Sequence, residues 1–261
     1  MKIIVCIKQV PDTTEVKLDP KTGRLIRDGV PSIINPDDKN ALEEALHIKD
    51  ENPETTVTVV SMGPPQADVA MREALAMGAD EAILISGREF GGSDTWATSY
   101  IIATAIKKIP DYDIIFCGRQ AIDGDTAQVG PQIAEQLNIP QITYVQKLDI
   151  EGDKVIVQRQ LEDGYTVVEA KMPVLLTAIK ELNTPRYMTP KGIFEAYNKT
   201  VQVWGFNDVP VDAEKIGLKG SPTNVNRTFS PEAKGKGIML EGADKETVKT
   251  LIAKLDEKHL L

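Results

Sequence analysis

Residues 114–131 read IIFCGRQAIDGDTAQVGP, and they are the most informative part of the sequence. Its apolar start is typical of a buried strand, a loop with glycines follows, and Val129, Ile133 and Leu137 then recur every four residues, as on one face of a helix. A strand, a turn and a helix start in this order bring unpaired N–H groups and the positive end of a helix dipole together. Because glycines let a backbone approach a phosphate closely, we interpret the turn as a nucleotide or dinucleotide phosphate site.

An alternative interpretation of the same turn is structural. Its spacing is neither the Rossmann pattern GxGxxG nor the P-loop pattern with its lysine, and Asp123 and Asp125 place negative charge near the expected phosphate. Asp125 then serves as the N-cap of a helix predicted over 125–137, since aspartate accepts hydrogen bonds from free N–H groups there. The two roles are compatible, because a phosphate can lie one residue away, at Thr126 and Gln128.

The first half of the chain alternates strands and helices. Strands are expected at 3–7, 57–60, 82–85 and 113–117, with helices opening near Asn35, after Met62 and after Gly91–Thr95, and with a hairpin over 16–26. This order predicts an α/β fold with a doubly wound, mostly parallel, Rossmann-like sheet. Ligands of such sheets bind beyond the carboxyl ends of the strands. We therefore expect one crevice formed by Cys6–Pro11, Asn35–Asp38, Ser61–Pro64, Gly91–Thr95 and Gly118–Gln128.

The pattern changes after about residue 140. Residues 142–150, 155–160 and 165–169 predict a β-ribbon, and 174–179 a further buried strand. From Leu182 onward the chain is expected to be irregular, with Trp204 and Phe206 in it, until a final helix over 244–257. We therefore predict a nucleotide- or flavin-binding α/β domain over 1–181 and a partner-docking arm over 182–261. The alternative is an arm folded back on its own sheet.

The composition limits the function classes. The 261 residues are 41% hydrophobic and 26% charged, as in soluble globular proteins, and the net charge of −9 disfavours nucleic acid as a partner. No apolar run reaches the length of a membrane span, and Cys6 and Cys117 are expected as reduced core residues of a cytoplasmic protein. His47 and His259 have no obvious catalytic partner, and no cysteine or histidine spacing predicts a metal site.

The chain resembles the beta subunit of electron-transfer flavoprotein along nearly its full length, and six stretches carry the resemblance. They are Val5–Asp12, Asn35-Pro36 with Ala41–Ala45, Ala74–Asp80, Gly118–Gly130, Met172-Pro173 and Leu182–Tyr187, of which Gly118–Gly130 is highly specific. The resemblance implies a heterodimer with an alpha subunit that carries FAD. In the respiratory branch of the family the beta subunit holds AMP. In the anaerobic branch it holds a second FAD, which accepts hydride from NADH. One electron then goes to ferredoxin or flavodoxin. The other goes through the alpha-subunit FAD to an acyl-CoA dehydrogenase or a lactate dehydrogenase-type enzyme.

This chain resembles the FAD-holding, electron-bifurcating branch in three segments: Gln9–Asp12, Gly91–Thr98 and Asp123–Thr126. The resemblance assigns the nucleotide to Cys6, Asn35, Pro36, Asp37, Asp38, Met62, Gly118, Arg119, Gln120, Ala121, Ile122, Asp123, Gly124, Asp125, Thr126, Ala127, Gln128 and Val129. Gly91, Gly92, Asp94 and Thr95 are expected to reach past the phosphates toward a ring system, with NADH stacking near the two glycines.

Some of these residues have simpler interpretations. Cys6 and Met62 are also explained by packing at strand ends, and Asp94 by a helix cap. Arg119 pairs with phosphate or flavin, or else lies on the surface or in an intersubunit salt bridge. Two departures from the family pattern are Thr166, where an acidic or amide residue is usual, and Pro190, where the docking loop usually carries a bulky aliphatic residue.

Two further functions compete with the bifurcating subunit. One is the non-bifurcating family member with structural AMP, and the other is a nucleotide-binding sensor or hydrolase of the same architecture. The sequence carries no P-loop lysine for the hydrolase. Because flavin chemistry belongs to the cofactor, we expect no catalytic acid or base in this chain.

Overall fold

The computed structural model describes residues 1–12, 31–226 and 235–261. It divides them into two compact units, Met1–Asn224 and Val225–Leu261, each of which is described by itself. The hairpin expected over 16–26 lies outside the described residues.

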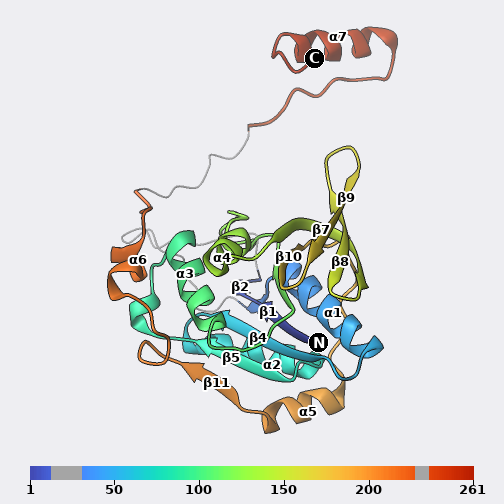
Figure 1. The fold of residues 1–261 in the computed structure, drawn as a ribbon. Helices are drawn as coiled ribbons and strands as arrows, with labels where there is room; N and C mark the ends of the chain where they lie inside the picture. Colours follow the sequence, from blue (N-terminus) through green and yellow to red (C-terminus); the bar gives the residue numbers. More distant parts are fainter. Residues whose placement is uncertain (13–30, 227–234) are drawn as a thin grey trace. The chain divides into compact units, whose positions relative to one another are not determined.

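The first unit is built on a mixed, mostly parallel sheet (Figure 1). Among the described residues its nine strands run in the order β11 (Val201–Trp204), β5 (Glu81–Ile85), β4 (Thr56–Met62), β1 (Lys2–Cys6), β6 (Ile114–Gly118), β10 (Val174–Ala178), β7 (Gln141–Glu151), β8 (Lys154–Gln160) and β9 (Tyr165–Lys171). The strands from β11 to β7 pair in parallel, whereas β8 and β9 add the antiparallel ribbon that the sequence predicts. The short strands β2 (Gln9–Pro11) and β3 (Ser32–Ile34) pair separately and antiparallel.

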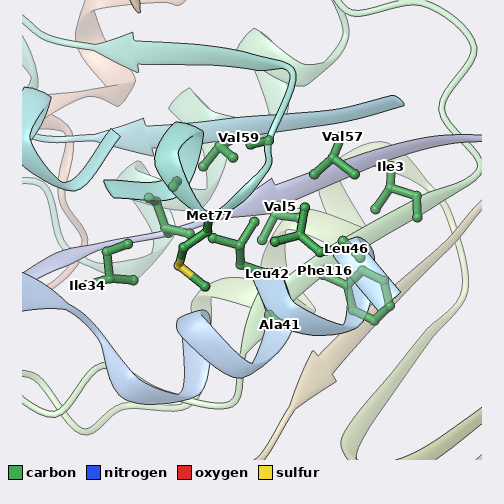
Figure 2. Close-up of a cluster of buried hydrophobic side chains, with 14 of the residues drawn as sticks. Ile3, Val5, Ile34, Ala41, Leu42, Leu46, Val57, Val59, Met77 and Phe116 are labelled. Carbon is green, nitrogen blue, oxygen red and sulfur yellow. The ribbon is translucent and has the colours of Figure 1, made fainter. Parts of the chain in front are cut away.

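Helices cover both faces of this sheet. Their bounds are α1 (Pro36–Glu51), α2 (Asp68–Met77), α3 (Thr95–Ile106), α4 (Val129–Leu137), α5 (Pro190–Asn198) and the short α6 (Gly217–Gly220). The α1 and α2 helices bury apolar side chains against alternate residues of the central strands, and Figure 2 shows Leu42 and Leu46 of α1 beside Val5 and Phe116. The residues between these, such as Ile4 and Ile115, face α3 and α4 in a second core cluster.

The winding of the sheet reverses between β1 and β6. From β1 the chain passes through α1, β4 and α2 to β5 on one side, and α3 then returns it to β6 on the other side of β1. The predicted doubly wound α/β fold is therefore confirmed. Ligands of such sheets bind beyond the carboxyl ends of the strands at the reversal, which here lies at Cys6 and Gly118, so we expect the crevice there.

The predicted start of α4 is wrong by four residues. The helix begins at Val129 with Gln128 in the N-cap position, and Asp125 caps nothing. Asp125 and Ala127 both adopt left-handed backbone conformations, with φ of 53° and 52°, so the right-handed helix begins only after them.

The prediction of an irregular chain from Leu182 onward is also wrong in part. Residues 190–198 form α5, and β11 extends the sheet by pairing with β5 from Val201↔Ala82 to Trp204↔Ile85. Trp204 and Phe206 consequently pack, partly buried, against the core cluster on the α3 side. The free edge of β5 explains this, since an apolar strand edge gains hydrogen bonds when another strand pairs with it.

The second unit contains the predicted final helix, α7 (Lys245–Asp256), which Asp244 caps through the N–H of Thr247. Its apolar residues Val248, Leu251 and Ile252 are about half exposed, at 50%, 47% and 50%. In the ranges that the structure describes, no helix combines the length and the apolar character needed to cross a membrane.

Candidate functional site

Two side chains at the start of α1 hold the loop that follows β6. Asn35 is completely buried, and its amide donates to the carbonyl of Gln120 over 2.8 Å and accepts the N–H of Ile122 over 3.0 Å. Asp38 accepts the N–H of Lys8 over 2.8 Å and that of Gly118 over 3.0 Å. The segments after β1 and β6, which meet at the reversal of the sheet, are thus fastened to one helix end.

Gly118 allows this close approach. A Cβ atom there would lie 2.6 Å from the backbone nitrogen of Asp38, closer than any real contact of a Cβ. The glycine is therefore required for the packing of β6 against α1 and not only for room beside a ligand.

The loop 123–128, which leads from β6 to α4, presents unpaired N–H groups. Within the described part of the chain, the backbone N–H groups of Thr126, Ala127 and Gln128 donate no hydrogen bond. They precede the N-terminus of α4, and the left-handed conformation of Ala127 beside the right-handed one of Gln128 makes a concave group of donors of the kind that binds anions.

The acidic residues of this loop are held by partners. Asp123 forms an ion pair of 2.6 Å with Lys8, and Asp125 accepts a hydrogen bond from the side chain of Gln120. The negative charge that weighs against a phosphate in the sequence is therefore engaged with other groups of the chain.

Arg119 lies beside Asp37, with Nε 3.3 Å from the carboxylate, and its guanidinium is 5.8 Å from the ring centre of Tyr144. Burial raises the pKa of Asp37 and the charge of Arg119 opposes that rise. Arg119 was expected to contact phosphate or flavin, to lie on the surface, or to form an intersubunit salt bridge. In the structure it forms an ion pair with Asp37 of its own chain.

The start of α3 meets the start of α4. Thr95 donates its hydroxyl to the side chain of Gln128 over 3.1 Å and accepts a bond from Gln132 over 3.4 Å. The amide oxygen of Gln132 is buried without a hydrogen-bond partner among the described residues. A buried acceptor without a partner needs an explanation because it is costly to leave unpaired, and a bound ligand would provide one.

Comparison with known proteins identifies the family. The electron transfer flavoprotein domain matches residues 22–209. The chain is 62% identical to the electron transfer flavoprotein subunit beta of Thermoanaerobacterium thermosaccharolyticum and 58% identical to the caffeyl-CoA reductase-Etf complex subunit CarD of Acetobacterium woodii, over 100% of both chains in each case. This chain belongs to the electron transfer flavoprotein family, as a beta subunit. The acryloyl-CoA reductase electron transfer subunit gamma of Anaerotignum propionicum is 53% identical, again over 100% of both chains.

In this electron transfer flavoprotein subunit, the segment Gly91–Asp94 is covered by residues 217–223. Asp94 caps α3 through the N–H of Ala97 and also accepts two bonds from Thr223. Gly92 has a φ of +80°, and a Cβ there would lie 3.1 Å from Leu218. The cap interpretation of Asp94 is confirmed, and a ring-binding role for Gly91 and Gly92 stays a prediction.

Cys6 and Met62 end two neighbouring strands of the same subunit. Cys6 and Cys117 are free and buried, as expected, and Met62 packs against the same core cluster. A hydrogen bond with Cys6, together with burial, raises the pKa of the Cys117 thiol. Packing accounts for both Cys6 and Met62, and contact with a nucleotide stays a prediction for them.

Sequence reasoning assigned no individual role to four contributors to this site: Lys8, Gln132, Ser221 and Thr223. Lys8 lies in the stretch that carries the family resemblance, so a signal for it was present. The other three gave none, because Gln132 reads as an ordinary helix residue and the pairing of residues 221–223 with Asp94 spans more than a hundred residues.

A cavity of about 950 Å³ lies elsewhere, between α1, β7 and residues 182–184. His47 and Glu44 are among its lining residues, and burial raises the pKa of Glu44. Among the residues described, no group of histidine, cysteine and acidic side chains is arranged to hold a metal ion.

Proposed function

We propose that this beta subunit binds FAD, accepts hydride from NADH, and bifurcates the electrons between ferredoxin or flavodoxin and, through an alpha-subunit FAD, an acyl-CoA dehydrogenase or related dehydrogenase. The observation that carries the proposal is the row of N–H groups from Thr126 to Gln128, which have no partner among the described residues and follow the strand at the reversal of the sheet. The names of two relatives, a caffeyl-CoA reductase complex subunit and an acryloyl-CoA reductase electron transfer subunit, support a CoA-linked acceptor.

The residues present fit a nucleotide diphosphate. The row of donors suits phosphate oxygens, and the positive end of the α4 dipole faces the same loop. A Cβ atom at Gly124 would meet no atom of the described residues within 4 Å, so the space beside this glycine is open to them. Thr126 adds an exposed hydroxyl group.

In this proposal the chain supplies position, and the bound FAD would supply the hydride and one-electron chemistry. Asn35 and Asp38 fix the loop 118–122, and Thr126, Ala127 and Gln128 hold the diphosphate by backbone N–H groups. The ion pair of Lys8 with Asp123 holds the acidic side chain away from it. Gly91, Gly92 and Thr95 border the region expected for the flavin ring and for NADH.

The proposal includes a heterodimer with the alpha subunit of an electron-transfer flavoprotein. The exposed apolar residues of α7 support this, because a small helix with such a face gains stability when another chain covers it. The docking role of residues 182–261 and a cytoplasmic location belong to the same proposal.

The test is the identity of the bound nucleotides. The purified heterodimer is denatured anaerobically, and the released nucleotides are separated and counted. Two FAD per heterodimer are expected, and anaerobic NADH should bleach flavin absorbance. One FAD with one AMP would support the non-bifurcating alternative and contradict the proposal, as would Mg²⁺-dependent ATP hydrolysis without bound flavin.

A further inference from the structure

The carboxylate of Asp38 joins three segments of the candidate site. It belongs to the first turn of α1, and its two oxygens accept the N–H of Lys8 after β1 and the N–H of Gly118 at the end of β6. The residue is 7% exposed. Asn35 fastens the same loop two residues further on, at Gln120 and Ile122.

The charges around Asp38 leave it without a cationic partner in the described part of the chain. The ammonium group of Lys8 pairs with Asp123, and the guanidinium of Arg119 pairs with Asp37. Asp37 itself faces Asp38 with a like charge. The buried thiols of Cys6, the last residue of β1, and Cys117, the residue before the end of β6, lie in the two adjacent strands.

This environment makes ionisation of Asp38 costly. Burial raises the pKa of the carboxyl to about 7, while the bonds from Lys8, Asn35 and Gly118 oppose the rise. An ionised carboxylate accepts both backbone N–H groups. A protonated one carries its own O–H donor on one oxygen and no longer has a negative charge, so the bonds that it accepts from the two N–H groups are weakened.

We propose that Asp38 is a positioning residue that locks the loop Gly118–Ile122 in its nucleotide-binding form when ionised and loosens that loop when protonated. Nucleotide retention then weakens as pH falls through neutrality. The retention depends on the proposed function, whereas the locking of the loop does not.

The test is hydrogen exchange, followed by mass spectrometry, on the purified complex at pH 6 and pH 8, with labelling times scaled for the base catalysis of exchange. The ionised fraction of Asp38 falls about tenfold between pH 8 and pH 6 for a pKa of about 7. Peptides covering Lys8 and Gly118–Ile122 should therefore lose several-fold protection at pH 6. The dissociation rate of the bound nucleotide, whichever it is, should rise in parallel.

Two variants separate this role from a general effect of pH. Asp38→Asn should show the weak protection at both pH values. Asp113→Asn is the matched control, because Asp113 accepts the N–H of Lys2 over 2.8 Å at the opposite ends of the same two strands. This control should keep the wild-type response to pH.

Equal protection of the wild-type loop at both pH values would overturn the proposal, as would an unchanged pH response in Asp38→Asn. The wild-type measurement decides alone if the variant does not assemble. Absence of FAD from the complex, with the loop still responding to pH, would count against the proposed function and leave the locking role standing.

Discussion

Gly118 and Gly124 have different roles. Gly118 ends β6, and Gly124 lies in the loop after it. Gly118 is needed by the protein itself, because a Cβ would collide with the backbone of Asp38. At Gly124 a Cβ would have no atom of the described part of the chain within 4 Å, so we expect a substitution there to affect chiefly what binds beside it. A substitution at Gly124 is therefore expected to test ligand binding without disturbing the fold.

Gly124→Val should release the bound nucleotide while the chain stays folded. The valine side chain occupies the space that we assign to the diphosphate, and an affinity loss of tenfold or more, about 1.4 kcal/mol, is expected. Flavin and AMP content after gel filtration measures it. Gly164→Val, in the turn between β8 and β9, is the control, since it also faces open space. Equal nucleotide content in both variants would contradict our assignment of the diphosphate to this loop.

At the scale of elements, α3 begins with a cap that also fastens a distant segment. Burial alone would raise the pKa of Asp94, but the bonds from Ala97 and Thr223 outweigh it and hold the pKa below its usual value. Because the pKa is lower in the folded state, Asp94 stabilises the protein above about pH 4, and this contribution disappears as pH falls through the lowered value.

Asp94→Ala should lower the free energy of unfolding by about 1 kcal/mol at pH 7, the usual cost of a lost N-cap. The difference from wild type should vanish in strongly acidic solution. Thermal unfolding of both proteins over a pH series measures this. A difference that persists unchanged in acid would show that the charge of Asp94 is not what matters.

The segment just before α3, which contains Gly92, is where we expect NADH to approach the flavin. Gly92→Leu would strain a backbone at φ +80° and press on Leu218, so this substitution disturbs the fold as well as any ring beside it. Slow flavin reduction by NADH in Gly92→Leu therefore reports on the disturbed fold as well as on the position of the nicotinamide ring.

The regular elements could be predicted from sequence because their apolar periodicity is local. The strands β1, β4, β5 and β6 and the helices between them follow from it, and so does the doubly wound order of the sheet. The start of α4 could not be predicted, because the left-handed conformations of Asp125 and Ala127 leave no signal in residue types that usually avoid them. β11 was missed because its four residues acquire strand structure only by pairing with β5.

At the scale of the whole molecule, residues 1–224 contain both core clusters, whereas α7 has no buried residue. Trp204 and Phe206 are partly covered by their own chain, so the case for a partner rests on α7 and its neighbours. A truncation near residue 200 would remove β11 from the sheet, and removal of residues 225–261 is the cleaner change.

Leu251→Asp should weaken binding of the alpha subunit at least tenfold, because it places a charge within the apolar face of α7. Thr250→Asp carries the same charge on the opposite side of this helix and should bind as wild type does. Co-purification with a tagged alpha subunit compares them. Normal assembly of both variants would show that α7 does not contact the partner.

The most direct test of the nucleotide site is an experimental structure of the purified heterodimer with the nucleotides it retains. Our account predicts FAD in the beta subunit, with diphosphate oxygens about 3 Å from the backbone nitrogens of Thr126, Ala127 and Gln128. A diphosphate held elsewhere, or these N–H groups bonded to the alpha subunit instead, would contradict it.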